Sequence, residues 1–95
     1  MALSLPLPPP WESRGWRVKI RDRERLEPPH VTVLHRTRQW RWNLRSGRFM
    51  DKEPPPGDVP EAIVTAIAEN LPLLRAQWDA MYPSNPVAPR EADDD

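Results

Sequence analysis

The stretch Gln39-Trp40-Arg41-Trp42-Asn43-Leu44 alternates polar and apolar side chains without interruption. In an extended chain successive side chains point to opposite faces, so the apolar members of this stretch share one face and the polar members the other. The next residues, Arg45-Ser46-Gly47-Arg48, are typical of a hairpin turn. The stretch therefore predicts a half-buried strand, followed by a turn and a short strand near Phe49 and Met50.

Two earlier segments have the same period of two. After Gly15, apolar residues alternate with cations in the run Trp16-Arg17-Val18-Lys19-Ile20-Arg21. After an interruption at Pro28 and Pro29, a second run from His30 to His35 places Val31 and Val33 opposite His30, Thr32 and Leu34. Together with the first stretch, these runs predict an antiparallel sheet of three to four strands, connected as a β-meander.

The second half of the chain predicts a helix. Pro54, Pro55, Pro56 and Gly57 mark the passage from sheet to helix, and Asp58 followed by Glu61 fits a capping box. Apolar residues then recur at helical spacing, at Ile63, Ile67, Leu71, Leu74, Trp78 and Met81. Pro72 lies inside this stripe, and the expectation is one long helix kinked there; a second helix starting after Asn70 is the alternative.

These elements predict one small two-layer α+β domain over residues 15–82, in which the helix stripe covers the apolar face of the sheet. The tryptophans in phase with that face are expected in the core. Residues 1–14 are expected to form a proline-rich, polyproline-like arm. Residues 83–95, which end in three aspartates, are expected to form a disordered acidic tail.

Charge is sorted along the chain, although its total is zero. Residues 1–50 hold 11 Lys and Arg against 4 Asp and Glu, whereas residues 51–95 hold 3 against 10. Such asymmetry points to a partner with an opposite surface rather than to a catalytic pocket.

The sheet face opposite the helix is the candidate binding surface. The alternation assigns to it Arg17, Lys19, Arg21, His30, Thr32 and Arg41. The planar fork of arginine suits bidentate contact with carboxylate or phosphate, so an acidic protein or a nucleic acid fits this face. Trp11, in the arm, is a candidate hydrophobic anchor or partner contact.

Little in the sequence points to catalysis, a metal or a cofactor. There is no cysteine and there are only two histidines, His30 and His35, which the alternation places on opposite faces. A Gly-rich phosphate loop, a Gly-x-Ser-x-Gly elbow and a His-Glu-x-x-His motif are all missing. We therefore expect no catalytic residue, no metal and no cofactor; a nuclease that uses His30 with Arg17 or Arg41 is the catalytic alternative.

Composition also bears on location and assembly. The first ten residues lack the basic start and continuous apolar stretch of a secretory signal, and no run of about 20 apolar residues would span a membrane. A cytoplasmic protein is therefore expected. A core of this size is often stabilised by association, so a protein partner or self-association is expected as well.

The order of these features resembles a known family. The chain has Pro28-Pro29-His30-Val31-Thr32-Val33 before its second strand and Leu74-Arg75-Ala76-Gln77-Trp78 in its helix. Over residues 15–80 it is similar to domain of unknown function 4160, small bacterial proteins with the signature Pro-Pro-His-Phe-His-Val. The resemblance implies a compact α+β fold and genes often found in toxin and antitoxin neighbourhoods. Thr32 replaces the second His of the signature, which weakens any role of paired histidines here.

The sequence thus predicts a non-enzymatic interaction module that binds a protein partner through the basic sheet face or an exposed strand edge. The alternative is a toxin-antitoxin component that binds or cleaves RNA.

Overall fold

The computed structural model describes residues 3–21 and 28–87. Its four strands form one antiparallel sheet in the order β1-β2-β3-β4, and two helices follow. The elements are β1 Leu3–Ser4, β2 Trp16–Ile20, β3 His30–His35, β4 Arg38–Asn43, α1 Glu61–Glu69 and α2 Leu71–Met81, with short 3-10 turns at Glu12–Arg14 and Pro56–Asp58. The predicted α+β class is confirmed.

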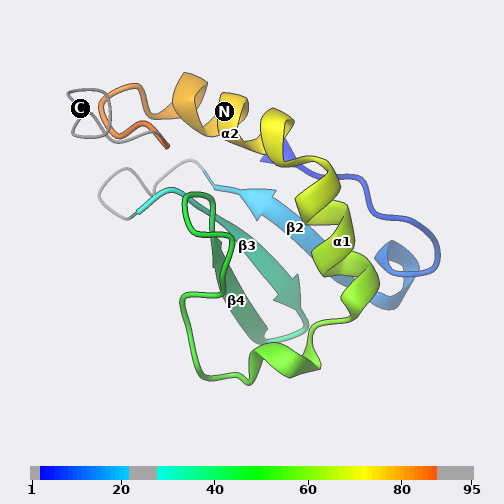
Figure 1. The fold of residues 1–95 in the computed structure, drawn as a ribbon. Coiled ribbons are helices and arrows are strands. Elements are labelled where there is room, and N and C mark those ends of the chain that lie inside the picture. The colour runs from blue at the N-terminus through cyan, green and yellow to red at the C-terminus, as the bar shows by residue number, and fades with distance from the viewer. Residues whose placement is uncertain (1–2, 22–27, 88–95) are drawn as a thin grey trace.

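The sheet and the helices form two layers. Helices α1 and α2 lie on one side of the sheet (Figure 1), and their buried residues join those of the strands in one core. The register pairs Val18 with Val33 and Val31 with Trp42, so the apolar residues of the three long strands share the helix side. Trp16, Trp40 and Trp42 are all buried there. The predicted phase of the strands and the core role of these tryptophans are confirmed.

The N-terminal segment belongs to the sheet. Leu3 pairs with Ile20, and the Leu5 N–H donates to the carbonyl oxygen of Val18 at 2.8 Å. The Leu5 side chain is only 3% exposed. The expected separate arm was therefore wrong for these residues, because Leu3 and Leu5 alternate like a strand before the prolines begin.

The turn after β4 has the expected form, but the strand after it is minimal. Gly47 has a φ of 73° and its N–H donates to the carbonyl oxygen of Asn43 at 2.9 Å. Phe49 forms a single bridge with Trp42, and hydrogen bonds from Asn43 to Arg48 and from Met50 to Arg41 flank it. The chain therefore runs beside the outer edge of β4 for only a few residues.

The C-terminal half forms two helices instead of one kinked helix. The N–H of Asn70 donates to the carbonyl oxygen of Ala66 at 3.2 Å, and its side-chain amide donates to the same oxygen at 2.7 Å. Pro72 then takes an early position in α2, where its missing N–H breaks no helical hydrogen bond. The kink was the wrong choice of the two, since proline starts a helix as readily as it bends one. In the described ranges, neither helix is long and apolar enough to cross a membrane.

The predicted capping box was also wrong. Helix α1 begins at Glu61 after Pro60, and no side chain caps it. Asp58 instead accepts a hydrogen bond from Arg38 of β4 at 3.0 Å. Asp58 thus forms a long-range ion pair with Arg38 instead of the helix cap that the local spacing predicted.

The residues after α2 pack on the domain. Val87 is buried, its N–H donates to Asp79, and Trp78 donates through Nε1 to the carbonyl oxygen of Asn85 at 2.7 Å. The Tyr82 hydroxyl donates to the carbonyl oxygen of Arg21, which joins the end of α2 to the end of β2. The expected tail therefore does not begin at residue 83. Residues 88–95, the remainder of that prediction, lie outside the described residues.

Candidate functional site

The sheet face turned away from the helices, here called the outer face, collects the predicted binding residues. The register pairs Lys19 of β2 with Thr32 of β3, and Thr32 with Arg41 of β4. These three side chains therefore share one face, as the alternation predicted. The three side chains differ, however, in their exposure to solvent.

Three cations of the outer face alternate along β2 and the residue after it, and we call Arg17, Lys19 and Arg21 the cationic row. Alternate residues of a strand are roughly 6.5 Å apart. Arg17 donates to the carbonyl oxygens of Glu12 and Trp16, and Arg21 donates to the Gln39 side chain at 3.0 Å. Lys19 has no hydrogen bond or ion pair with any described residue. The row therefore keeps at least one uncommitted charge.

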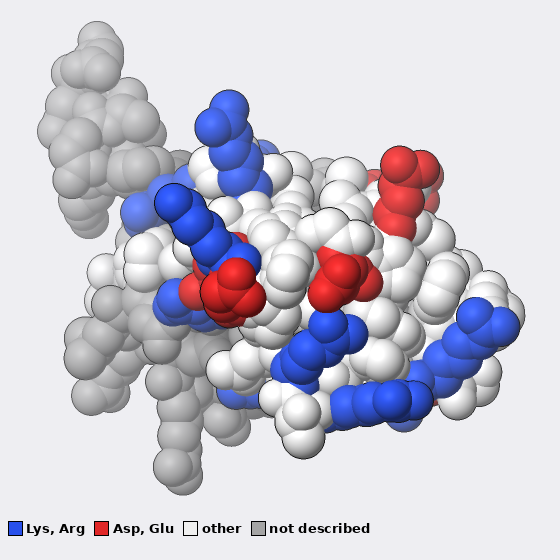
Figure 2. All heavy atoms as spheres, turned by 90° about the horizontal axis from the view of Figure 1, so that it is seen from below, with Lys and Arg blue, Asp and Glu red and all other residues white. Residues whose placement is uncertain are grey.

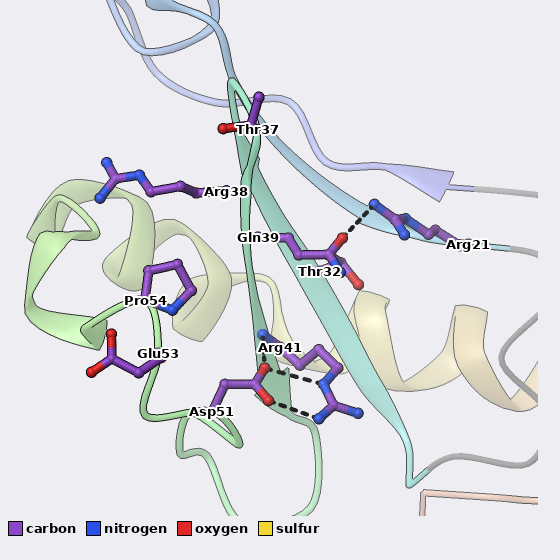
Figure 3. A pocket seen from close by; sticks show the side chains of 9 residues that line it. All are labelled: Arg21, Thr32, Thr37, Arg38, Gln39, Arg41, Asp51, Glu53 and Pro54. Atoms are coloured by element: carbon purple, nitrogen blue, oxygen red, sulfur yellow. Dashed lines mark hydrogen bonds and ion pairs between the residues drawn. The ribbon is translucent and has the colours of Figure 1, made fainter.

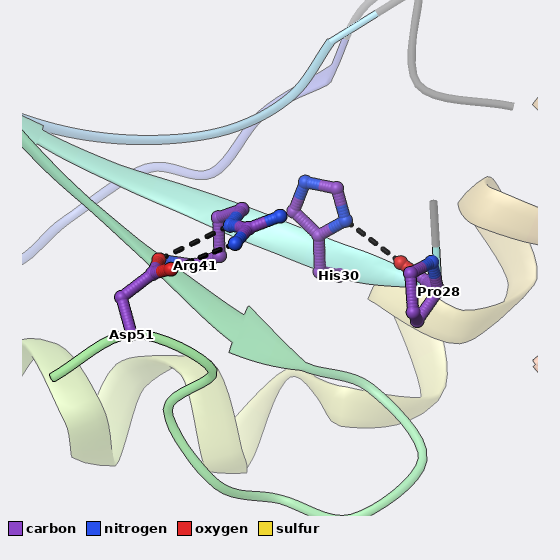
Figure 4. A network of polar contacts seen from close by, with 4 residues as sticks. All are labelled: Pro28, His30, Arg41 and Asp51. Atoms are coloured by element: carbon purple, nitrogen blue, oxygen red, sulfur yellow. Dashed lines mark hydrogen bonds and ion pairs between the residues drawn. The ribbon is translucent and has the colours of Figure 1, made fainter. Parts of the chain in front are cut away.

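His30 is on the outer-face side of β3 by parity but is 0% exposed, so its expected role as a surface contact was wrong. Its Nδ1–H donates to the carbonyl oxygen of Pro28 at 2.8 Å (Figure 4), and its ring centroid lies 5.6 Å from that of Trp78. His30 is the first residue of β3, where the C-terminal half of α2 reaches the end of the sheet. A partner cannot touch a side chain in this position.

Thr32 is also less accessible than expected, because it is only 2% exposed. The longer side chains of Lys19 and Arg41 flank it on the two neighbouring strands. The hydrogen bond between Arg21 and Gln39 passes beside it (Figure 3). Thr32 is therefore part of the floor of the outer face instead of a projecting contact.

Arg41 holds Asp51, an acid that our sequence reasoning had not placed on this face. Arg41 Nε lies 3.1 Å from Asp51 Oδ2 and its Nη2 lies 2.7 Å from Oδ1, while the Arg41 backbone N–H donates to Oδ2 at 3.1 Å (Figure 4). Hydrogen bonding by this guanidinium, opposed by some burial, lowers the pKa of Asp51 below its ordinary value of 3.8. The positive charge of Arg41 is thus largely neutralised by an internal carboxylate.

A polar groove of about 440 Å³ crosses the outer face. Its lining comes from β3, β4 and the turn between them, from the residue directly after β2 and from the loop after β4: Arg21, Thr32, Thr37, Arg38, Gln39, Arg41, Asp51, Glu53 and Pro54. Figure 3 shows Arg21 on one side, Glu53 and Pro54 on the other, and Thr32 and Gln39 between them. Arg21 thus lines one side of the groove, whereas Arg38, Glu53 and Pro54 line the other.

The loop after β4 is fixed to that strand by aromatic and ionic contacts. Arg38 lies 4.9 Å above the Trp40 ring and pairs with Asp58 at 3.0 Å. Trp40 donates through Nε1 to the carbonyl oxygen of Pro55 at 3.1 Å. The loop that carries Glu53 is thus held at both ends, by Asp51 before it and by Pro55 and Asp58 after it.

Cations do not form a single uniform patch on the surface drawn in Figure 2, where acidic side chains lie directly beside basic ones. The described residues still hold eleven Lys and Arg against seven Asp and Glu, a net charge of +4. The described part of the chain is therefore moderately basic, and Arg38 and Arg41 are among the cations already held in internal ion pairs.

The second predicted surface, an exposed strand edge, is mostly covered. On the outer edge of β4, Arg48 and Met50 pair with Asn43 and Arg41. Only Gln39, two residues earlier on the same edge, keeps its backbone groups without a backbone partner among the described residues. On the other side of the sheet, β1 pairs with β2 and is itself the edge strand, but it is only two residues long. The outer face is therefore the better candidate for a partner.

Trp11 packs partly against the core of its own domain, and the Arg14 guanidinium lies 5.8 Å from its ring centroid. The side chain is half-buried, so only part of it is open to a partner. The contact with its own core explains why an aromatic residue is tolerated in this proline-rich segment.

The histidines lie apart, as the alternation predicted. His35 is on the helix side of the sheet, where its ring stacks on Trp16 with a centroid separation of 4.1 Å and an interplanar angle of 4°. In the described part of the chain, no group of three or more His, Cys, Asp or Glu side chains is arranged to hold a metal ion.

Comparisons of the chain with protein-family models, curated proteins and solved structures gave no match. The resemblance to domain of unknown function 4160 stays a prediction.

Proposed function

We propose that this protein is a non-enzymatic interaction module that binds an acidic, extended segment of a protein partner on its outer face. The observation that carries the proposal is the cationic row. Arg17 and Lys19 of β2 and Arg21 directly after it alternate along the chain, on a side of the sheet that no described helix covers (Figure 1). The row lies beside a groove large enough for a short peptide.

The spacing of the row suits an extended chain. Every second side chain of a peptide in the β conformation repeats at roughly 6.5 Å, the same interval as the cations of β2. A partner segment with acids at alternate positions would therefore place one carboxylate near each cation. Exposed charge pairs of this kind contribute about 0.2–1 kcal/mol each. Binding of the partner segment should therefore be of modest affinity and should weaken as the salt concentration rises.

The RNA alternative receives less support from this surface. Glu53 lines the groove without an ion pair to any described residue. A polyphosphate chain, which carries a negative charge on every residue, would meet more repulsion from it than a segment whose acids are spaced apart. The catalytic form of that alternative relied on His30, whose side chain is enclosed.

The proposal can be tested by purifying the tagged protein from its own host under mild, low-salt conditions, with and without nuclease. A doubly reversed variant, Lys19→Glu with Arg21→Glu, is compared with the wild type, and Arg48→Glu is the control because Arg48 is exposed but lies outside the row and the groove. We expect a stoichiometric protein partner that survives nuclease, is lost from the double variant and is retained by the control. Recovery of nucleic acid that salt removes, with no protein partner, would overturn the proposal in favour of RNA or DNA binding.

A further inference from the structure

We infer that the groove contains a subsite for a single carboxylate at Arg21, and that one acidic side chain of the partner segment binds there. Arg21 is then the anchor of the cationic row, and Gln39 is the positioning residue that orients it. The inference rests on the proposed function and adds to it which cation makes the main contact and which anion that contact accepts.

The three cations of the row have different surroundings. Arg17 donates through Nη1 to the carbonyl oxygens of Glu12 and Trp16, at 2.8 and 2.7 Å. Lys19 forms no hydrogen bond or ion pair with any described residue, and it does not line the groove. Arg21 is the one member of the row that belongs to the groove lining. A ligand that enters the groove therefore meets this cation of the row.

Arg21 is held in a defined position. Its Nη2 donates to Gln39 Oε1 at 3.0 Å, and the bond reaches from the end of β2 to β4, beside Thr32 of the strand between them (Figure 3). A guanidinium carries several N–H donors, and this bond uses one of them. A side chain that is already held loses less conformational freedom when a ligand binds. Gln39 therefore prepares Arg21 for an anion without adding a charge of its own.

Arg21 also carries the positive charge of the groove that is still unbalanced. Arg38 and Arg41 each pair with an aspartate. Glu53 lines the groove as well, but Figure 3 shows its carboxylate directed away from Arg21. Arg21 itself forms no ion pair with any described residue. A single monovalent anion would match this remaining charge.

The lining favours a carboxylate as that anion. The planar fork of arginine can donate two parallel hydrogen bonds to the two oxygens of a carboxylate. A phosphate group would also fit the fork, but it carries a charge of about −1.5 to −2 at neutral pH, more than one arginine balances. Thr32 and Thr37 add hydroxyl groups to the lining, which can donate to an anion without changing the charge. The occupant is therefore the side chain of one Asp or Glu of the segment.

The test removes the cations of the row one at a time, with Arg17→Gln, Lys19→Gln and Arg21→Gln. Fluorescence anisotropy measures the binding of a labelled eight-residue alternating Glu-Ala peptide with an amidated C-terminus. We expect Arg21→Gln to weaken binding about ten-fold, the effect of losing charge-assisted hydrogen bonds, and the other two about two-fold each, the effect of an exposed charge pair. Arg21→Lys keeps the charge but loses the fork, and should weaken binding about three-fold. Arg48→Gln removes an exposed cation outside the row and the groove, and should bind as wild type does.

Two substitutions of Gln39 test its positioning role. Gln39→Glu places a carboxylate of the protein itself against Arg21, so peptide binding should fall about ten-fold, whereas Gln39→Met removes the acceptor without adding a charge and should weaken binding about two-fold. The Nε–H signal of Arg21 in NMR spectra is the direct readout: it should shift during titration of wild type with the peptide and stay in place in Gln39→Glu. The bond between Tyr82 and Arg21 uses the main-chain carbonyl oxygen of Arg21, so none of these substitutions removes it.

The outcomes separate this inference from the proposal beneath it. Equal losses in the three single-cation variants would overturn the anchor role of Arg21 and leave the acidic-segment proposal standing. Wild-type affinity in Gln39→Glu would overturn the role of Gln39. Binding that requires a free C-terminus on the peptide would overturn the assignment to an acidic side chain, and tighter binding after one Glu is replaced by phosphoserine would overturn the choice of a carboxylate. Failure of wild type to bind the peptide, amidated or not, would overturn both the inference and the proposed function.

Discussion

The ion pair between Arg41 and Asp51 makes a strong prediction about stability. Replacing Asp51 with alanine removes three hydrogen bonds at once, two from the Arg41 guanidinium and one from its backbone N–H. The substitution also removes the carboxylate that faces the guanidinium beside the buried Thr32. Because these contacts attach the loop to β4, the effect should appear in the global unfolding of the domain.

The magnitude follows from the exposure of the pair. A hydrogen bond to a charged group contributes about 1.5–3 kcal/mol when it is shielded, and a fully exposed ion pair contributes about 0.2–1 kcal/mol. The side chains of Arg41 and Asp51 are 36% and 25% exposed, so the pair lies between these limits. We expect Asp51→Ala to lower the free energy of unfolding by about 2 kcal/mol.

A matched control is provided by the more exposed pair of Arg38 and Asp58. Their side chains are 41% and 48% exposed, and a single hydrogen bond of 3.0 Å joins them. Asp58→Ala should therefore cost about 1 kcal/mol or less. Both variants are compared by urea unfolding followed by tryptophan fluorescence, in which Asp51→Ala should lower the midpoint by roughly 1–2 M.

The pH dependence gives an independent check. Because Arg41 holds the pKa of Asp51 below its ordinary value of 3.8, the ionised pair stabilises the folded protein above that pH. This contribution is lost as the pH falls through the lower pKa of the folded state. The difference between wild type and Asp51→Ala should therefore be constant near neutral pH and shrink below about pH 3.8. Equal costs for Asp51→Ala and Asp58→Ala, or a difference that does not change in acid, would refute the structural role of the pair.

Three further predictions concern the fold. Trp78→Ala should lower the free energy of unfolding by about 3–5 kcal/mol, because the fully buried indole fills the core and donates to Asn85; retention of wild-type stability in a melting experiment would contradict this. Pro72→Ala should change the free energy of unfolding by less than about 1 kcal/mol, whereas Ala68→Pro inside α1 should lower it by about 3 kcal/mol. Urea unfolding measures both values, and similar losses in the two variants would contradict a helix start at Leu71. Arg36→Gly should leave stability unchanged or raise it by up to about 1 kcal/mol, because Arg36 has a φ of 59°, and a clear loss in the same assay would show that its side chain makes a needed contact.

Much of the sheet was predictable because strand alternation is local. The period of two assigned Val18, Val33 and Trp40 to one face before any pairing was known, and the register then brought them together. The helix stripe was equally clear. The break at Asn70 was not, because the sequence permits Pro72 either to bend a helix or to begin one, and the choice depends on how Asn70 closes the first helix.

The accessibility of the candidate site was much harder to predict. Alternation gave the correct face for His30 and Thr32, but it contains no information on what covers that face. His30 is enclosed by residues far away in the chain, and Thr32 lies between long side chains of two other strands. Asp51 and Glu53 could be placed in the groove only once the path of the loop beside β4 was known. The one sequence signal for them is that the acidic half of the chain begins directly after the hairpin.

The groove also changes how the charge pattern of the chain is interpreted. Sorted charges suggested a basic surface open to an anion, but two arginines of β4, Arg38 and Arg41, already have acidic partners from the second half of the chain. Some cations of the first half are thus already paired with acids of the second half inside the domain. What is left for a partner is the short cationic row, which favours a segment with a few spaced acids over a long polyanion.

The most informative measurement is a titration of the isotopically labelled protein with the alternating Glu-Ala peptide, followed by amide chemical shifts. Our proposal predicts shifts on β2 and along the groove, at Lys19, Arg21, Thr32 and Gln39, that disappear in the Lys19→Glu, Arg21→Glu variant. Shifts confined to α1 and α2, or shifts that persist in that variant, would contradict the assignment of the outer face as the binding surface.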